Sequence, residues 1–123
     1  MSDPSVLIDE ATLRQLAEDI AAEDLVVVIS TFTADIQRLS AALRASARAA
    51  DLAAYHRTAH ALAGAAGVVG ATMLEADART AMAAGSPDAM FAASVADLGE
   101  RTLAALRALL AGGSIRLAGS SHQ

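Results

Sequence analysis

Apolar residues recur every three or four positions along most of this chain, which is the period of an amphipathic α-helix. The pattern predicts a first short helix after Asp9, whose carboxylate is a good N-cap, and a long second helix from about residue 23 to 49. Asp51 fits the N-cap of a third helix, which ends near Gly67 and Gly70 because glycine is the usual residue after a helix C-terminus. The first apolar stripe contains Leu13, Leu16 and Ile20, and the second contains Leu25, Val28, Phe32, Ile36, Leu39 and Leu43.

Two further helices are predicted in the C-terminal part of the chain. Thr72 followed by Glu75 fits a capping box, which opens a shorter helix. Ser86 and Pro87 combine a good N-cap residue with the residue preferred at the first helical position. From there the apolar pattern continues to about residue 111 and predicts a long final helix.

The connections between the predicted helices are only a few residues long, so neighbouring helices run antiparallel. We therefore expect an all-α fold: an up-and-down antiparallel four-helix bundle with a short additional N-terminal helix across one end. The expected organisation is an N-terminal extension over residues 1–8, a single bundle over 9–111 and a tail over 112–123.

Composition narrows the functional classes. Hydrophobic residues make up 54% of the chain and aromatic residues only 2%, with much alanine, which is typical of closely packed helices. The absence of cysteine excludes a disulfide framework, a cysteine-based zinc site and a thiol nucleophile. The net charge of −5 argues against a nucleic-acid partner, because phosphates would be repelled over most of the surface.

The sequence also gives an expectation about location. Its first residues lack a basic region followed by an apolar stretch, which a secretory signal would have. No later segment runs for about 18 residues without polar interruption, the length that a membrane span needs. A cytoplasmic location without membrane association is therefore expected.

His60 is the most informative single residue. Each helical residue advances about 100°, so Tyr55, Leu62 and Val69 fall on the face opposite His60 and are expected in the core, while His60 faces solvent. Its neighbours within one or two turns are mostly small: Ala53, His56, Arg57, Ala63, Gly64 and Gly67. No Asp or Glu occurs between Leu52 and Leu74, so this face is neutral to basic and suits an anionic group.

These residues resemble the histidine-containing phosphotransfer (HPt) domains of phosphorelays. The family pattern is Ala-His-x-Leu-Lys-Gly, with a glycine ten residues after the histidine and a leucine one turn later. This chain reads Ala59-His60-Ala61-Leu62-Ala63-Gly64, followed by Gly70 and Leu74. The resemblance covers about residues 7–111, from the first stripe to the end of the final helix.

The resemblance implies a phosphocarrier and not an enzyme. His60 would accept a phosphoryl group and exchange it with the aspartate of a response-regulator receiver domain, in a pathway fed by a sensor or hybrid histidine kinase. The chain has no glycine-rich phosphate loop and no acidic cluster suited to Mg²⁺, so no cofactor is expected and Mg²⁺ belongs to the receiver. We expect a monomer, which leaves the His60 face free.

Gly64 and Gly67 are predicted to keep this face accessible. Glycine inside a helix costs roughly 0.5–1 kcal/mol relative to alanine. Gly64 lies about 40° from His60 on the outward face, where a β-carbon would obstruct a phosphoryl group or a docking partner. Gly67 has a second explanation, because it lies near the predicted end of the helix.

One position departs from the family pattern. The lysine expected three residues after the histidine is replaced by Ala63, and the chain has no lysine at all. Arg57, about 60° around the helix from His60, is the predicted substitute, since a guanidinium binds phosphoryl oxygens well. The departure also leaves open a second hypothesis, that the chain is a helical adaptor that binds receiver or kinase domains without carrying phosphate.

A third hypothesis concerns a metal. His56 and His60 lie four residues apart on one face, a spacing that can ligate a metal ion. Further ligands would have to come from another helix, for example Glu75 or Asp77, and nothing in the sequence places them there. No metal site is therefore predicted, and His56 is expected to be a solvated neighbour of the site.

Overall fold

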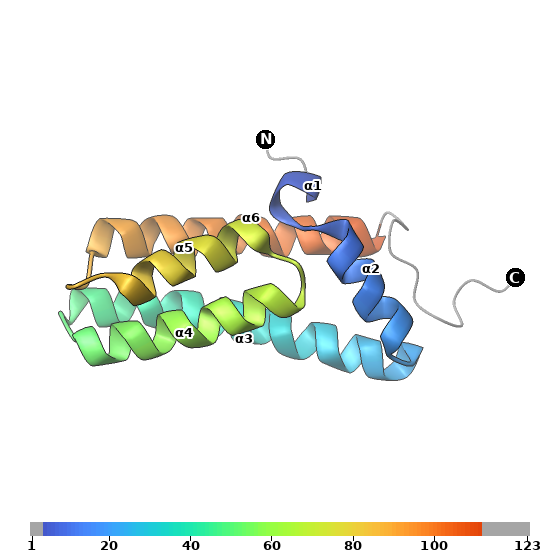
Figure 1. Cartoon of the computed structure of the whole chain (residues 1–123), viewed down its shortest axis with the longest axis horizontal. Coiled ribbons are helices and arrows are strands. Elements are labelled where there is room, and N and C mark those ends of the chain that lie inside the picture. The colour runs from blue at the N-terminus through green and yellow to red at the C-terminus, as the bar shows by residue number, and fades with distance from the viewer. Residues whose placement is uncertain (1–3, 112–123) are drawn as a thin grey trace, which may run out of the picture.

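Helices account for nearly all of residues 4–111, which are the part of the chain described by a computed structural model. They are α1 (Pro4–Leu7), α2 (Glu10–Asp19), α3 (Ala22–Arg48), α4 (Leu52–Val68), α5 (Thr72–Ala83) and α6 (Ala89–Ala111). Figure 1 shows α3 to α6 running back and forth as an antiparallel bundle, with α2 lying across one end. The predicted all-α four-helix bundle with an additional N-terminal helix is confirmed. The tail over 112–123 lies outside the described residues.

Two of the predicted helix starts are confirmed by side-chain caps. The Asp9 carboxylate accepts a hydrogen bond from the backbone N–H of Ala11, and the Asp51 carboxylate accepts one from Ala54. Each cap satisfies an N–H group that has no partner within its helix. Asp51 thereby fixes the start of α4, the helix that carries His60.

Of the three other predicted starts, the one near residue 23 agrees with α3, which begins at Ala22. The starts that rest on Thr72 and on Ser86–Pro87 are displaced by one and by two residues. The N-cap of α5 is Ala71, which has no side-chain cap, and Thr72 is already helical, so the capping box does not form. α6 begins at Ala89 and not at Ser86–Pro87. There the Asp88 carboxylate accepts a hydrogen bond of 2.9 Å from the Phe91 N–H and so caps the helix two residues later than predicted.

The core follows the predicted apolar stripes. Tyr55, Leu62 and Val69 of the His60 region are wholly buried, as expected, whereas Phe32 and Phe91 are partly buried and pack against the core. Two further buried residues, Leu7 and Ile8, belong to the N-terminal segment for which the sequence pattern gave no element. α1 is a single helical turn, too short to show a helical period, and it packs on α6.

α4 and α5 each carry buried alanines, which helical geometry places on the sides turned toward one another. Together we call them the alanine seam: Ala59, Ala63, Ala66, Ala78 and Ala81. Because alanine projects only a methyl group, two helices that meet through it approach closely. α5 lies beside α4 along the bundle (Figure 1). Its Met82 side chain contacts His60 of α4.

α3 is the one helix among the described residues that is long and apolar enough to cross a membrane. One face of α3 packs into the core, with Leu25, Ile36 and Leu43 almost completely buried, while Val26 and Val27 are exposed. Its contacts with α4 and α6 run along the bundle.

Gly70 lies in the loop between α4 and α5 and forms a backbone hydrogen bond to the residue that caps α2. Its carbonyl accepts a hydrogen bond of 2.7 Å from the Asp9 N–H, and its φ of +77° is one that L-residues rarely adopt. A β-carbon at this position would lie 2.7 Å from the Asp9 carbonyl oxygen. Glycine is therefore required here for two reasons, the backbone conformation and the close approach of another backbone segment.

We expect Gly70→Ala to lower the free energy of unfolding by about 1–3 kcal/mol, from the unfavourable φ and the clash with Asp9. Gly85→Ala is the matched control, because a β-carbon at Gly85 meets nothing within 4 Å and its φ lies outside the left-handed region. The control should keep or slightly raise stability, since alanine restricts the unfolded chain. Chemical denaturation of both variants checks this, and equal stability in the two would contradict it.

Candidate functional site

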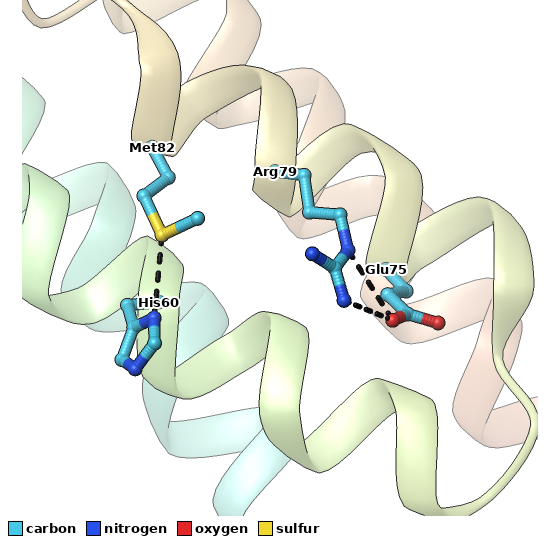
Figure 2. A network of polar contacts seen from close by, with 4 residues as sticks. All are labelled: His60, Glu75, Arg79 and Met82. Atoms are coloured by element: carbon cyan, nitrogen blue, oxygen red, sulfur yellow. Dashed lines mark hydrogen bonds and ion pairs between the residues drawn. The ribbon is translucent and has the colours of Figure 1, made fainter.

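His60 lies on the exposed face of α4, beside α5. Its Nδ1 atom is 3.3 Å from the Met82 Sδ atom on α5 (Figure 2). A thioether sulfur can only accept a hydrogen bond, so the contact is favourable when Nδ1 carries the ring proton. The Nε2 lone pair is then free, on a side chain that is exposed to solvent.

His56 does not have the role expected of it. Its Nε2 atom lies 2.6 Å from the Ala84 carbonyl oxygen, so the ring donates a hydrogen bond to the end of α5 and is partly buried. The prediction of a solvated neighbour is therefore wrong, because His56 ties α4 to the segment that follows α5. A ring nitrogen used in this way is not a free metal ligand, and the described residues contain no group of three side chains suited to a metal.

Tyr55 adds no second reactive group to this face. It is wholly buried beside His56, with the two ring centroids 6.4 Å apart. Burial raises the pKa of the Tyr55 hydroxyl, so the phenol stays protonated and supplies neither a base nor a negative charge near His60.

Ala63 is also placed differently from the prediction. Helical spacing predicts it on the exposed face beside His60, but its side chain is only 5% exposed and belongs to the alanine seam. Helical geometry explains this: Ala63 lies about 60° from His60 on the side of His56, which faces α5, whereas Gly64 lies on the opposite side. Ala63 therefore packs between helices and is not available to a docking partner.

The two glycines near His60 differ from each other. Gly64 is exposed, and a β-carbon at this position would meet nothing within 4 Å, so the space beside His60 is open. A β-carbon at Gly67 would lie 3.3 Å from a carboxylate oxygen of Glu75. The space at Gly67 is therefore used by a residue of α5, and Gly64 alone fits the predicted role of access.

Arg79 of α5, which the sequence pattern did not single out, lies on the side of α5 that faces α4 (Figure 2). The Arg79 guanidinium on α5 donates to one Glu75 carboxylate oxygen through Nη2 at 2.8 Å and Nε at 3.3 Å. Figure 2 shows both side chains on the side of α5 that also carries Met82 and faces α4. The Glu75–Arg79 spacing of four residues, with the glutamate first, was a detectable signal for this pair.

Arg57, the substitute cation predicted from the sequence, is exposed on α4. It lies about 60° from His60 on the side away from α5. No ion pair of Arg57 occurs within residues 4–111. The two arginines therefore flank His60 from opposite sides, one from its own helix and one from the neighbouring helix.

The site is an open surface and not a pocket. A groove of about 700 Å³ lies between α3 and α6, and the residues that line it include Arg44, Arg48 and Arg107 but not His60. His60 instead projects from an exposed helix face with open space at Gly64. Such a surface suits contact with another folded protein better than enclosure of a small substrate.

Comparison with known proteins agrees with this geometry. The Hpt domain family matches residues 23–112, which span α3 to α6 and therefore the whole bundle. Searches of curated proteins and of solved structures gave no match. Hpt domains are phosphocarriers in histidine phosphotransfer, and their fold is the helical bundle found here. Because the match covers well over half of the sequence, the chain belongs to the Hpt domain family.

Proposed function

We propose that this chain is a phosphorelay intermediate that accepts a phosphoryl group on Nε2 of His60. The observation that carries the proposal is the environment of that ring. Nδ1 is engaged by Met82, while Nε2 belongs to an exposed side chain with open space at Gly64. Family membership supports the reaction class, and this geometry supports the choice of His60 and of its Nε2 atom.

The transfer needs little from the chain beyond this nitrogen. The Nε2 lone pair attacks the phosphorus of a receiver's aspartyl phosphate, and the P–N bond forms as the bond from phosphorus to the aspartate oxygen breaks. The electron pair of that bond returns to the aspartate carboxylate. Nδ1 keeps its proton during the attack, so the product ring is cationic until that proton is released to water. The same steps in reverse return the group to a receiver.

The partners follow from this division of work. We propose response-regulator receiver domains as exchange partners and a sensor or hybrid histidine kinase as the ultimate donor. The receiver would supply Mg²⁺ and most of the catalytic groups, so the chain itself would work without a cofactor. A cytoplasmic monomer fits this role, because the His60 face must meet several partners in turn.

The test is to incubate the chain with a phosphorylated receiver or an active kinase and to locate the label. We expect an acid-labile, base-stable modification on His60, which is the behaviour of a phosphohistidine. Binding to receivers without any label from any donor would instead support the adaptor hypothesis, which the replacement of the family lysine by Ala63 keeps open.

A further inference from the structure

The contacts between α4 and α5 show which residues of these two antiparallel helices face each other. His60 contacts Met82, and the β-carbon position of Gly67 contacts Glu75. Seven residues forward along α4 thus correspond to seven residues backward along α5. The two helices keep one register over the whole of this stretch.

The same register places Arg79 level with Ala63. Ala63 lies three residues after His60, and Arg79 lies three residues before Met82. In the family pattern the position of Ala63 holds a lysine. At this level of the bundle α5 therefore carries an arginine, while the position of the family lysine on α4 carries no charge.

The small, buried Ala63 and the long, exposed Arg79 fit a site in which α5 carries the positive charge in place of α4. Ala63 is 5% exposed, so its methyl group lets α5 pack closely. The Arg79 side chain is 63% exposed and extends from the edge of α5 that faces α4 (Figure 2). Along the bundle axis Arg79 is offset from the level of His60 by three helical residues, a rise of about 4.5 Å.

We infer that Arg79 is the residue that binds the phosphoryl group on His60, and that Glu75 holds Arg79 while His60 is unmodified. The inference rests on the proposed function and adds to it the source of the missing cation. Compared with the family pattern, the positive charge is carried by α5 and not by α4, at the same level along the bundle. The guanidinium leaves Glu75 and donates hydrogen bonds to phosphoryl oxygens.

The Glu75–Arg79 pair is well suited to such an exchange. The two residues are four positions apart, with the Arg79 side chain 63% exposed and the Glu75 side chain 28% exposed. Water at the exposed guanidinium weakens its attraction to Glu75. A phosphoryl group carries more negative charge than a carboxylate and offers three oxygen acceptors. Glu75 therefore orients Arg79 along α4 and competes only weakly once His60 is phosphorylated.

Arg57 provides a matched comparison, because both arginines are exposed and lie near His60 from opposite sides. The experiment measures the equilibrium between phosphorylated receiver and phosphorylated chain for the parent, Arg79→Gln and Arg57→Gln. Arg79→Gln should lower the phosphorylated fraction by about threefold to tenfold relative to the receiver, as expected for a partly exposed charge-assisted contact. Arg57→Gln should change it by less than about twofold, and Arg79→Lys should recover part of the loss.

Glu75→Gln tests the second half of the inference. It should raise the phosphorylated fraction by about twofold in the parent, because Arg79 no longer has a competing partner. In the Arg79→Gln background the same change should have no effect, since the competition that it removes is already absent. An equal gain in both backgrounds would show that Glu75 acts as a simple negative charge and would overturn its role as the holder of Arg79.

A phosphorus NMR titration distinguishes binding from a structural effect. A guanidinium near the phosphoryl group favours its more negative form, so Arg79→Gln should raise the apparent pKa of the phosphoryl group on His60, and Arg57→Gln should not. An unchanged pKa and an unchanged equilibrium in Arg79→Gln would overturn the inference while leaving His60 as the acceptor. A parent that takes no label at all would instead refute the proposed function.

Discussion

A His60→Gln variant is expected to take no detectable phosphoryl group from a receiver or a kinase while keeping its fold. Glutamine has no nucleophilic nitrogen, so the attack on phosphorus has no replacement. The side chain is exposed, and its one polar contact within residues 4–111 is to the Met82 sulfur, so the free energy of unfolding should change by less than about 0.5 kcal/mol. Labelling and chemical denaturation of the same sample measure both quantities.

His56→Gln is the matched control for that variant and should show the opposite behaviour. It removes the 2.6 Å hydrogen bond to the Ala84 carbonyl oxygen and should lower the free energy of unfolding by about 0.5–1.5 kcal/mol. Acceptance of label should remain. Label on His60→Gln, or its loss in His56→Gln, would show that the acceptor lies one turn away from its assigned position.

The second large effect is expected at Gly64. Gly64→Gln should slow transfer by about 100-fold, the scale of loss when reacting groups are displaced by about 1 Å. The chain itself should tolerate the change, because a β-carbon here meets nothing within 4 Å and the gain in helix propensity is worth about 0.5–1 kcal/mol. Loss of transfer together with a gain in stability would identify Gly64 as a position kept open for a partner.

Ala61→Gln is the control for Gly64→Gln. Ala61 is also exposed on α4 but points about 100° away from His60. It should transfer at a rate close to that of the parent, measured as the initial rate of exchange with the same receiver. If the two glutamine variants transfer equally fast, Gly64 is not part of the docking surface.

Helical periodicity was sufficient to predict the bundle and the exposed position of His60. Both follow from residues on a single helix, whose angular relations need no knowledge of the neighbours. The burial of Ala63 could not be predicted from helical periodicity. Its angle from His60 was correct, but which side of α4 would be covered by α5 depends on packing between helices, and so its burial was not foreseen.

The same limit explains why Arg79 was missed. Arg79 lies 19 positions from His60 in the sequence, and only the register between α4 and α5 brings it to the same face. The misplaced start of α6 has a local cause. Ser86–Pro87 and Asp88 each offer a plausible start, and the choice between them depends on which residue meets a free backbone N–H group.

The alanine seam has a consequence for how a signal passes through this molecule. Alanine has no rotatable side-chain torsion beyond its methyl group, so the alanine seam has no alternative rotamers to adopt, whereas Met82, Glu75 and Arg79 at its edge do. A seam of this kind can separate or stay closed, but it cannot repack in small steps. We therefore expect a phosphoryl group on α4 to be felt by the nearby side chains of α5 and to leave the far side of the bundle unchanged. The chain would then pass its signal on only by transferring the phosphoryl group, and not by a conformational change of the bundle.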